Sequence, residues 1–246
     1  MINFTITATR RPEILARTLE SFDRNMGHLW PHEAIINIDP IGPGTVRECI
    51  DIVEHYFGDT MHCEPETPGL GKAFKTVWQA AADNKSKYIF HLEDDWELLR
   101  PVALAAMIEF MEINRDFAAL RLPISNGEPG HIKTWNRYMP WNDVLGIYEV
   151  PEDQRLSVGF CGHPSLIRGD FVREVVDYLD PEKNPEKQFH RGGHPRILSA
   201  VQRYRWGIWS RPGDPPAIRD IGRQWMVENG YRKEGNKSYF VKWTGI

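Results

Sequence analysis

The chain has 246 residues, of which 41% are hydrophobic and 26% are charged, a composition that favours a globular fold and excludes an intrinsically disordered chain. Its formal net charge of −4 gives no reason to expect a nucleic-acid polymer or an anionic membrane as partner. The three cysteines, Cys49, Cys63 and Cys161, are too few and too widely spaced for a disulfide scaffold or a zinc site.

Hydrophobic periodicity predicts alternating strands and helices over the first half of the chain. The expected strands are residues 2–8, 34–38, 87–92 and 117–122. The expected helices begin at Pro12, with Thr9 or a neighbour as cap, and then cover 46–57, 69–82 and 101–114. This alternation implies right-handed βαβ crossovers, and therefore an α/β, Rossmann-type, mainly parallel sheet flanked by helices.

The second half of the chain has a different character. Residues 125–164 are rich in Gly, Pro, Asn and Trp and show weak periodicity, as do long loops that act as lids or binding surfaces. Helices are expected again over 170–179 and 195–204. We therefore expect a single domain over 1–246 whose second half is rich in loops.

Three adjacent carboxylates, Glu93, Asp94 and Asp95, follow the apolar strand at 87–92. Neighbouring carboxylates repel one another, and a hard cation such as Mg²⁺ or Mn²⁺ would compensate for that repulsion. Ligands of parallel sheets bind at the carboxyl ends of the strands, where this triplet falls. The sequence therefore indicates a metal site, with a solvated acidic turn as the alternative.

Two other strand ends carry residues suited to a nucleotide. Arg10 and Arg11 follow the first strand, and guanidinium groups at a helix start suit phosphates, although surface arginines would give the same pattern. Asp39 ends the second strand, where its carboxylate can accept a hydrogen bond from a base or a ribose or can form an ordinary turn with Pro40.

Three further motifs are less specific. Gly69-Leu70-Gly71-Lys72 has neither P-loop nor dinucleotide spacing, which leaves a helix start with Lys72 near a phosphate or base. The stretch from His190 to His194 lacks the Glu of a zinc motif, so a surface or supporting role is favoured over metal contact. The segment 220–225 can be a phosphate clamp or a packed corner. Nine tryptophans can stack on sugar rings or fill the core.

The order of these segments resembles glycosyltransferases with the GT-A fold. Residues 7–21 are similar to their first strand, loop and helix, and 71–97 to their helix, strand and DxD-type motif. The Glu-Asp-Asp form is similar to that of the N-acetylglucosaminyltransferase I group. Residues 162–172 are similar to an acceptor-side segment of family-2-like enzymes. The resemblance covers 2–125 well and the remainder loosely.

The resemblance implies roles for individual residues. Asp95 would ligate Mn²⁺ or Mg²⁺, and Glu93 and Asp94 would face the ribose and the nucleotide. The pocket for the nucleotide would be lined by Thr7, Thr9, Arg10 or Arg11, and Asp39. Many relatives supply a further metal ligand from a C-terminal histidine, which has no clear counterpart here; His194 or Arg223 would have to replace it.

An inverting transfer needs a carboxylate base on the acceptor side. The segment 180–190 joins two expected helices and carries three candidates. Glu186 follows Pro185 at an expected helix start, where the dipole favours a carboxylate, so we select it, with Asp180 as runner-up. The alternative is that these are solvated loop charges.

The sequence therefore predicts a hexosyltransferase-class enzyme that moves a sugar from a nucleoside diphosphate sugar, UDP-linked by preference, to a hydroxyl of a carbohydrate or other acceptor. Residues 1–125 would bind the donor and 126–246 the acceptor. One alternative is a sugar-phosphate nucleotidyltransferase, but such enzymes use a glycine-rich first loop, and residues 5–12 contain no glycine. The other alternative is a carbohydrate-binding protein without catalysis. No signal peptide or membrane span is expected, so the cytoplasm is the expected location.

Overall fold

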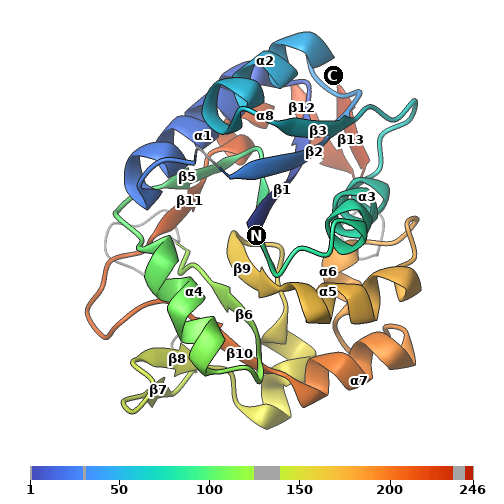
Figure 1. Cartoon of the computed structure of the whole chain (residues 1–246). Coiled ribbons are helices and arrows are strands. Elements are labelled where there is room, and N and C mark those ends of the chain that lie inside the picture. Colours follow the sequence, from blue (N-terminus) through green and yellow to red (C-terminus); the bar gives the residue numbers. More distant parts are fainter. Residues whose placement is uncertain (1, 30–31, 125–138, 235–241, 246) are drawn as a thin grey trace.

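The computed structural model describes residues 2–29, 32–124, 139–234 and 242–245, and its centre is a nine-stranded sheet (Figure 1). In the order in which they lie in the sheet, the strands are β3 (Thr60–Cys63), β2 (Glu33–Asp39), β1 (Ile2–Thr9), β4 (Tyr88–Glu93), β9 (Ser165–Arg168), β6 (Phe117–Arg121), β10 (Arg205–Ile208), β8 (Ile147–Glu149) and β7 (Trp141–Asn142). Two antiparallel pairs lie outside it: β5 (Trp96–Leu98) with β11 (Ile218–Asp220), and β12 (Tyr231–Glu234) with β13 (Lys242–Gly245).

Helices cover both faces of the sheet and bury a separate core on each. They are α1 (Pro12–Met26), α2 (Val46–Phe57), α3 (Leu70–Asp83), α4 (Leu104–Ile113), α5 (Gly169–Val175), α6 (Pro185–Gln188), α7 (Pro195–Arg203) and α8 (Gly222–Glu228), with short 3₁₀ and π turns at Glu152–Gln154, Arg155–Gly159 and Val176–Tyr178. One core joins the sheet to α1, α2 and α4, and the other joins it to α3, α5 and α7. Within the described chain, no helix combines the length and the apolar character that crossing a membrane requires.

Alternation along the strands assigns residues to the two cores. On β4, Phe90 and Leu92 enter the core of α1, whereas Ile89 enters the core of α3, because successive side chains leave opposite faces of a strand. The central strands are therefore buried on both faces, as in a covered parallel sheet, although one face of β1 carries the buried polar residues Asn3, Thr5 and Thr7.

The expected fold class is confirmed, with one correction to the pairing. Strands β3, β2, β1 and β4 are parallel neighbours, as the βαβ alternation predicts. However, β9 inserts antiparallel between β4 and β6, and the sequence pattern gave no strand there. Its four residues are too few to show a period, and its position depends on two strands that are distant in sequence.

The cap expected for the first helix is wrong. Helix α1 begins at Pro12 with Arg11 as its N-cap residue, and no side chain caps it. The Thr9 hydroxyl instead donates a hydrogen bond to Asp94 Oδ2 at 3.1 Å. The start of α1 is thus joined to the end of β4 by polar contacts.

Candidate functional site

The backbone fixes the acidic triplet at one edge of the sheet. Glu93 ends β4 in register with Thr7 of β1. The next residue, Asp94, donates its N–H to the Thr7 carbonyl at 3.0 Å, and its own carbonyl accepts from the Thr18 hydroxyl at 2.7 Å. The carboxyl ends of two parallel strands and the first helix therefore meet at the triplet.

The Asp94 carboxylate is buried and fully engaged. Its Oδ2 accepts from the backbone N–H of Thr9 at 2.9 Å and from the Thr9 hydroxyl, and its Oδ1 accepts from Arg11 Nη2 at 2.6 Å. Arg11 is also buried, and it donates from Nε to Thr9 Oγ1 at 2.6 Å and from Nη2 to Asp95 Oδ2 at 3.2 Å. Asp94 thus anchors the loop after β1 to the end of β4.

Asp95 remains partly open, with 24% of its side chain exposed. Burial and the neighbouring carboxylates of Asp94 and Asp220 raise the pKa of Asp95 to about 7, against the opposing effect of Arg11. Burial, with Asp95, Asp94 and Glu186 as further causes, raises the pKa of Glu93 well above its usual range. Three carboxyl groups thus share this edge with the Arg11 guanidinium, and a bound cation would favour their charged forms.

The donor set at this edge suits a divalent cation that substrate phosphates help to hold. In the part of the chain that the structure describes, no group of three His, Cys, Asp or Glu side chains could hold a metal by itself. Mg²⁺ and similar ions are commonly held by one or two carboxylates together with substrate phosphates, and Asp95 fits that kind of site. Burial, and after it the carboxylates of Asp94 and Asp220, raises the pKa of Asp95, and a bound cation would favour its charged form.

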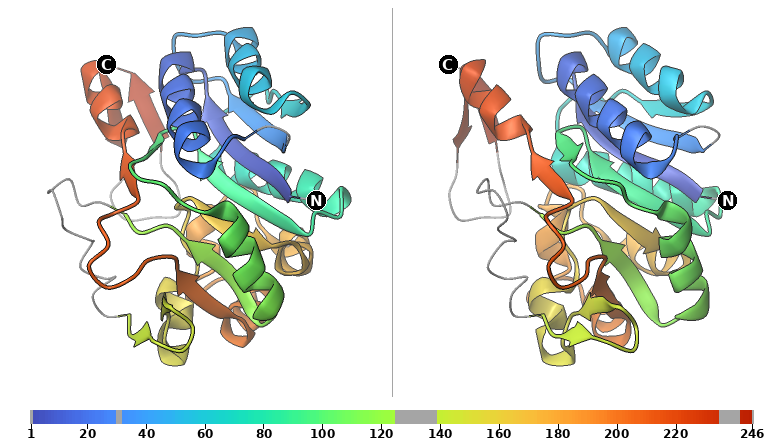
Figure 2. Two further views of the ribbon diagram at one scale, coloured as in Figure 1. Left: turned by 60° about the vertical axis from the view of Figure 1, so that its left-hand side comes forward. Right: turned by 90° about the vertical axis from the view of Figure 1, so that its left-hand side faces the viewer.

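Helix α8, from the far end of the chain, closes one side of this edge. Figure 2 shows it beside the N-terminal part of the molecule, and the Trp225 ring lies 5.4 Å from the Arg11 guanidinium carbon. Ile221 donates its N–H to the Asp95 carbonyl at 2.9 Å, and a Cβ added to Gly222 would overlap the Asp95 carboxylate. The segment 220–225 is thus a corner packed against Asp95.

Two of the C-terminal alternatives lie elsewhere. Arg223 is exposed on α8, where its backbone N–H donates to Asp220 Oδ1 at 3.1 Å. His194 caps α7 by accepting from the Arg196 N–H at 3.2 Å and stacks on Tyr178 at 4.7 Å between ring centroids. No described contact joins either side chain to the triplet.

The other donor-side candidates surround the same edge. Arg10 pairs with Glu64 at 3.2 Å, and its Nε is buried without a hydrogen-bond partner among the described residues. Asp39 accepts from the Gly69 N–H at 2.8 Å and from the Asn37 side chain at 2.9 Å. Burial raises the pKa of Asp39, and the charges of Asp94 and Lys72 also act on it, so these groups share one region.

The structure brings Glu186 towards the triplet. Glu186 lies in the short helix α6 and is one of the groups that raise the pKa of Glu93 and of Cys161, after burial as the main cause in both. The runner-up, Asp180, pairs with Lys183 at 2.9 Å and accepts from the Glu182 N–H. Of the candidate bases, Glu186 is the one with a described electrostatic contact to the triplet.

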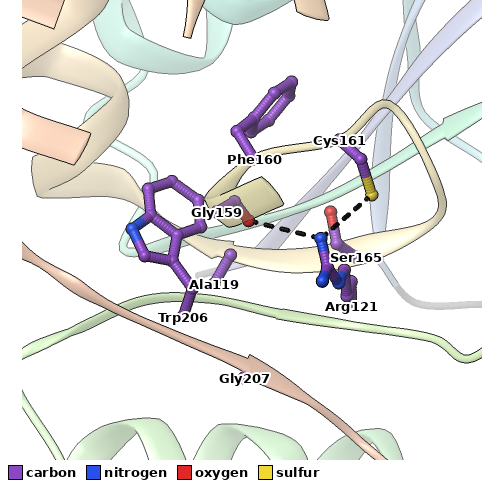
Figure 3. Close-up of a pocket in the computed structure, with 8 residues that line it drawn as sticks. All are labelled: Ala119, Arg121, Gly159, Phe160, Cys161, Ser165, Trp206 and Gly207. Carbon is purple, nitrogen blue, oxygen red and sulfur yellow. Dashed lines mark hydrogen bonds between the residues drawn. The ribbon is translucent and has the colours of Figure 1, made fainter. Parts of the chain in front are cut away.

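Sequence reasoning missed Arg121, which holds in place the loop of residues 158–162. This loop lies between Glu93 and Glu186 in space. Arg121 is buried at the end of β6, and its Nη1 donates to the Val158 carbonyl at 2.6 Å and approaches Cys161 Sγ at 3.6 Å. Figure 3 shows Arg121 and Cys161 directed towards one another in a small pocket. A single arginine at a strand end gives little signal in a sequence.

The loop that carries Phe160 and Gly162 lies near both Glu93 and Glu186. His190 Nε2 donates to the Phe160 carbonyl at 3.1 Å, and a Cβ on Gly162 would lie 3.7 Å from Glu93 Oε1.

The tryptophans have different roles: Trp206 is buried and donates to the Val201 carbonyl, whereas Trp225 contacts Arg11. Trp135 lies outside the described residues.

Neither a scan against protein-family models nor a search of the curated proteins finds a match. Solved structures do match. S. aureus TarS 1–349 in complex with UDP has a TM-score of 0.61 at 13% identity, over 89% of this chain and 60% of that one. The same protein in complex with UDP-GlcNAc gives 0.58 at 14% identity, over 89% and 58%.

A mannosyltransferase from Pyrobaculum calidifontis, in complex with GDP-Man and Mn²⁺, gives a TM-score of 0.59 at 10% identity, over 89% of this chain and 56% of that one. This chain therefore spans less than two thirds of the length of these proteins. At such identities the likeness shows the fold alone. The chain accordingly has the GT-A-like α/β fold that its sequence predicts.

Proposed function

We propose that this protein is a metal-dependent glycosyltransferase that moves a sugar from a nucleoside diphosphate sugar, UDP-linked by preference, to an acceptor hydroxyl. The observation that carries the proposal is Asp95, a partly open carboxylate of raised pKa at the carboxyl edge of the sheet. Solved structures of the same fold are complexes with UDP-GlcNAc and with GDP-Man and Mn²⁺, which supports a sugar nucleotide as ligand.

The donor would lie over the strand ends of residues 1–125, and the acceptor would approach from residues 126–246. The pocket for the nucleotide would be formed by Thr7, Thr9, Arg10 or Arg11, Asp39, Lys72, Glu93 and Asp94. Of the two arginines, Arg10 is better placed for a diphosphate, because 31% of its side chain is exposed and its pair with Glu64 lies at the surface, whereas Arg11 is buried against Asp94 and Asp95. The free cysteines suit a reducing compartment, so we propose a cytoplasmic site of action.

A Mn²⁺ or Mg²⁺ ion held by Asp95 would neutralise charge on the leaving diphosphate. Glu186 would accept the proton of the acceptor hydroxyl. The hydroxyl oxygen would then form the new bond to the sugar carbon as the diphosphate departs from that carbon. Such a direct displacement inverts the configuration at the sugar carbon. The position of Glu186 near Glu93 supports this assignment.

Calorimetric titration with UDP, with and without Mn²⁺, tests the proposal. We expect Mn²⁺ to strengthen UDP binding about tenfold or more, equivalent to about 1.4 kcal/mol. Asp95→Asn should abolish that gain because it removes the ligand charge while keeping the shape. Asp116→Asn, at an exposed ion pair with Arg205, is the matched control and should bind as the wild type does.

The outcome of the titration separates the alternatives. An Asp95→Asn variant that keeps the full gain from Mn²⁺ would remove Asp95 from the metal site. A wild-type protein that binds free sugars but no nucleotide in either condition would be a carbohydrate-binding protein.

A further inference from the structure

Arg11 directs its whole side chain at the protein. Only 6% of it is exposed, and its guanidinium contacts Thr9 Oγ1, Asp94 Oδ1 and Asp95 Oδ2. The Trp225 ring lies 5.4 Å from the guanidinium carbon. The contacts with Thr9, Asp94 and Asp95 engage Nε and Nη2, so this edge of the guanidinium bonds the protein and not a ligand.

The geometry of these contacts suits a guanidinium and no other cation. A guanidinium has five N–H donors in a rigid plane, so one side chain can bond a hydroxyl and two carboxylates in fixed directions. Asp94 and Asp95 are adjacent like charges that would repel one another without it. Asp95 is further confined by Gly222, where a side chain would overlap its carboxylate.

We propose that Arg11 is a positioning residue, which orients Asp95 for the metal through its contacts with Asp94 and Asp95 and docks α8 through Trp225, and that it does not bind the diphosphate. The inference rests on the proposed metal-dependent donor site. It assigns the phosphate contact to Arg10, which lies on the same loop and leaves 31% of its side chain exposed.

Calorimetry on Arg11→Met, with Arg10→Met for comparison, tests the assignment. Without metal, Arg11→Met should bind UDP and uridine within about threefold of wild type, while its gain from Mn²⁺ should fall about tenfold or more, as expected for a lost orientation of Asp95. Arg10→Met should lose affinity for UDP, and not for uridine, in the absence of metal. A selective loss of metal-free UDP binding in Arg11→Met would overturn the proposal.

Thermal unfolding gives a test that does not depend on any ligand. Arg11→Met should lower Tm because it leaves a buried carboxylate without its partner, and adding Asp94→Asn should recover much of the loss. Additive losses in the double variant would contradict the positioning role. If Arg11→Met does not fold, Arg11→Lys serves in both experiments, since it keeps the charge without the planar donors.

These two experiments separate the possible failures. If wild type gains no nucleotide affinity from Mn²⁺, the proposed function fails. The Tm values of Arg11→Met and of the double variant with Asp94→Asn still decide whether Arg11 holds Asp94 in place.

Discussion

Three consecutive carboxylates have three different surroundings. Asp94 is buried and bonded to Thr9 and Arg11, Asp95 is partly open against α8, and Glu93 lies towards the loop near Gly162 and Glu186. A strand end that turns its successive side chains in different directions can therefore give one residue to structure and another to a ligand. The proposed metal contact at Asp95 depends on its two neighbours for its charge environment.

Glu186→Gln tests the proposed base. The change keeps the shape and removes the basicity, so sugar transfer should fall by about 10²-fold or more while donor binding is retained. Glu174→Gln, on α5 and paired with Arg203, is the control and should leave transfer unchanged. Transfer by Glu186→Gln at the wild-type rate would show that another group accepts the proton.

The triplet could be located from the sequence because its position depends only on the apolar strand before it. The partners of its members could not, since they come from distant segments: Trp225 lies behind Arg11, and Glu186 acts on Glu93. Thr9 shows the limit most clearly. Its type suits a helix cap, and the tertiary contact with Asp94 overrides that preference.

At the scale of elements, the start of α3 joins the donor side to the acceptor side. The Gly69 N–H donates to Asp39 on β2, and Lys72 pairs with Glu182 at 3.2 Å. A Cβ on Gly71 would overlap the carbonyl oxygens of the loop 181–183, so the helix can approach that loop only with glycine there. This loop leads directly to Glu186.

Gly71→Ala should therefore destabilise the protein although alanine favours a helix. Forcing the loop away from α3 should lower the free energy of unfolding by about 1–3 kcal/mol, as overpacking does. Gly69→Ala is the matched control, because its Cβ would meet Lys72 at an ordinary 3.4 Å. Urea denaturation of both variants measures the difference, and equal stability would show that the loop yields freely.

At the scale of the whole molecule, the parallel strands were predictable and the assembly of the second half was not. The regular βαβ alternation fixes β1, β2 and β4 as neighbours. The antiparallel insertion of β9 and the pairing of β10 with β6 depend on contacts that local periodicity does not encode. Arg121 shows the consequence for the site, since its carbonyl partners lie on a loop far along the chain.

The centre of the sheet also makes stability depend on pH. His91 is buried on β4, where its Nδ1 accepts from Trp78 Nε1 at 3.4 Å, and burial lowers its pKa to about 3. The unfolded chain therefore binds more protons than the folded one between pH ~6.5 and ~3. The contribution of neutral His91 to the free energy of unfolding is fully present above pH ~6.5. It is lost as the pH falls, by about 1.4 kcal/mol per pH unit.

Replacing this histidine isolates its contribution. His91→Asn should show a shallower loss of unfolding free energy between pH ~6 and ~4 than wild type does, whatever its stability at neutral pH. His62→Gln, at an exposed position on β3, is the control and should keep the wild-type slope. Equal slopes for wild type and His91→Asn, followed by chemical denaturation, would contradict a neutral buried histidine.

The most direct test of the proposed sugar transfer is to follow the fate of sugar nucleotides incubated with the protein. With Mn²⁺ and a panel of UDP- and GDP-linked sugars, chromatography should detect a nucleoside diphosphate and free or transferred sugar, since water can replace the acceptor slowly. Release should require the metal and should be lost in Asp95→Asn. Formation of a nucleoside triphosphate and sugar 1-phosphate on addition of pyrophosphate, or no turnover of any sugar nucleotide with Mn²⁺ present, would contradict it.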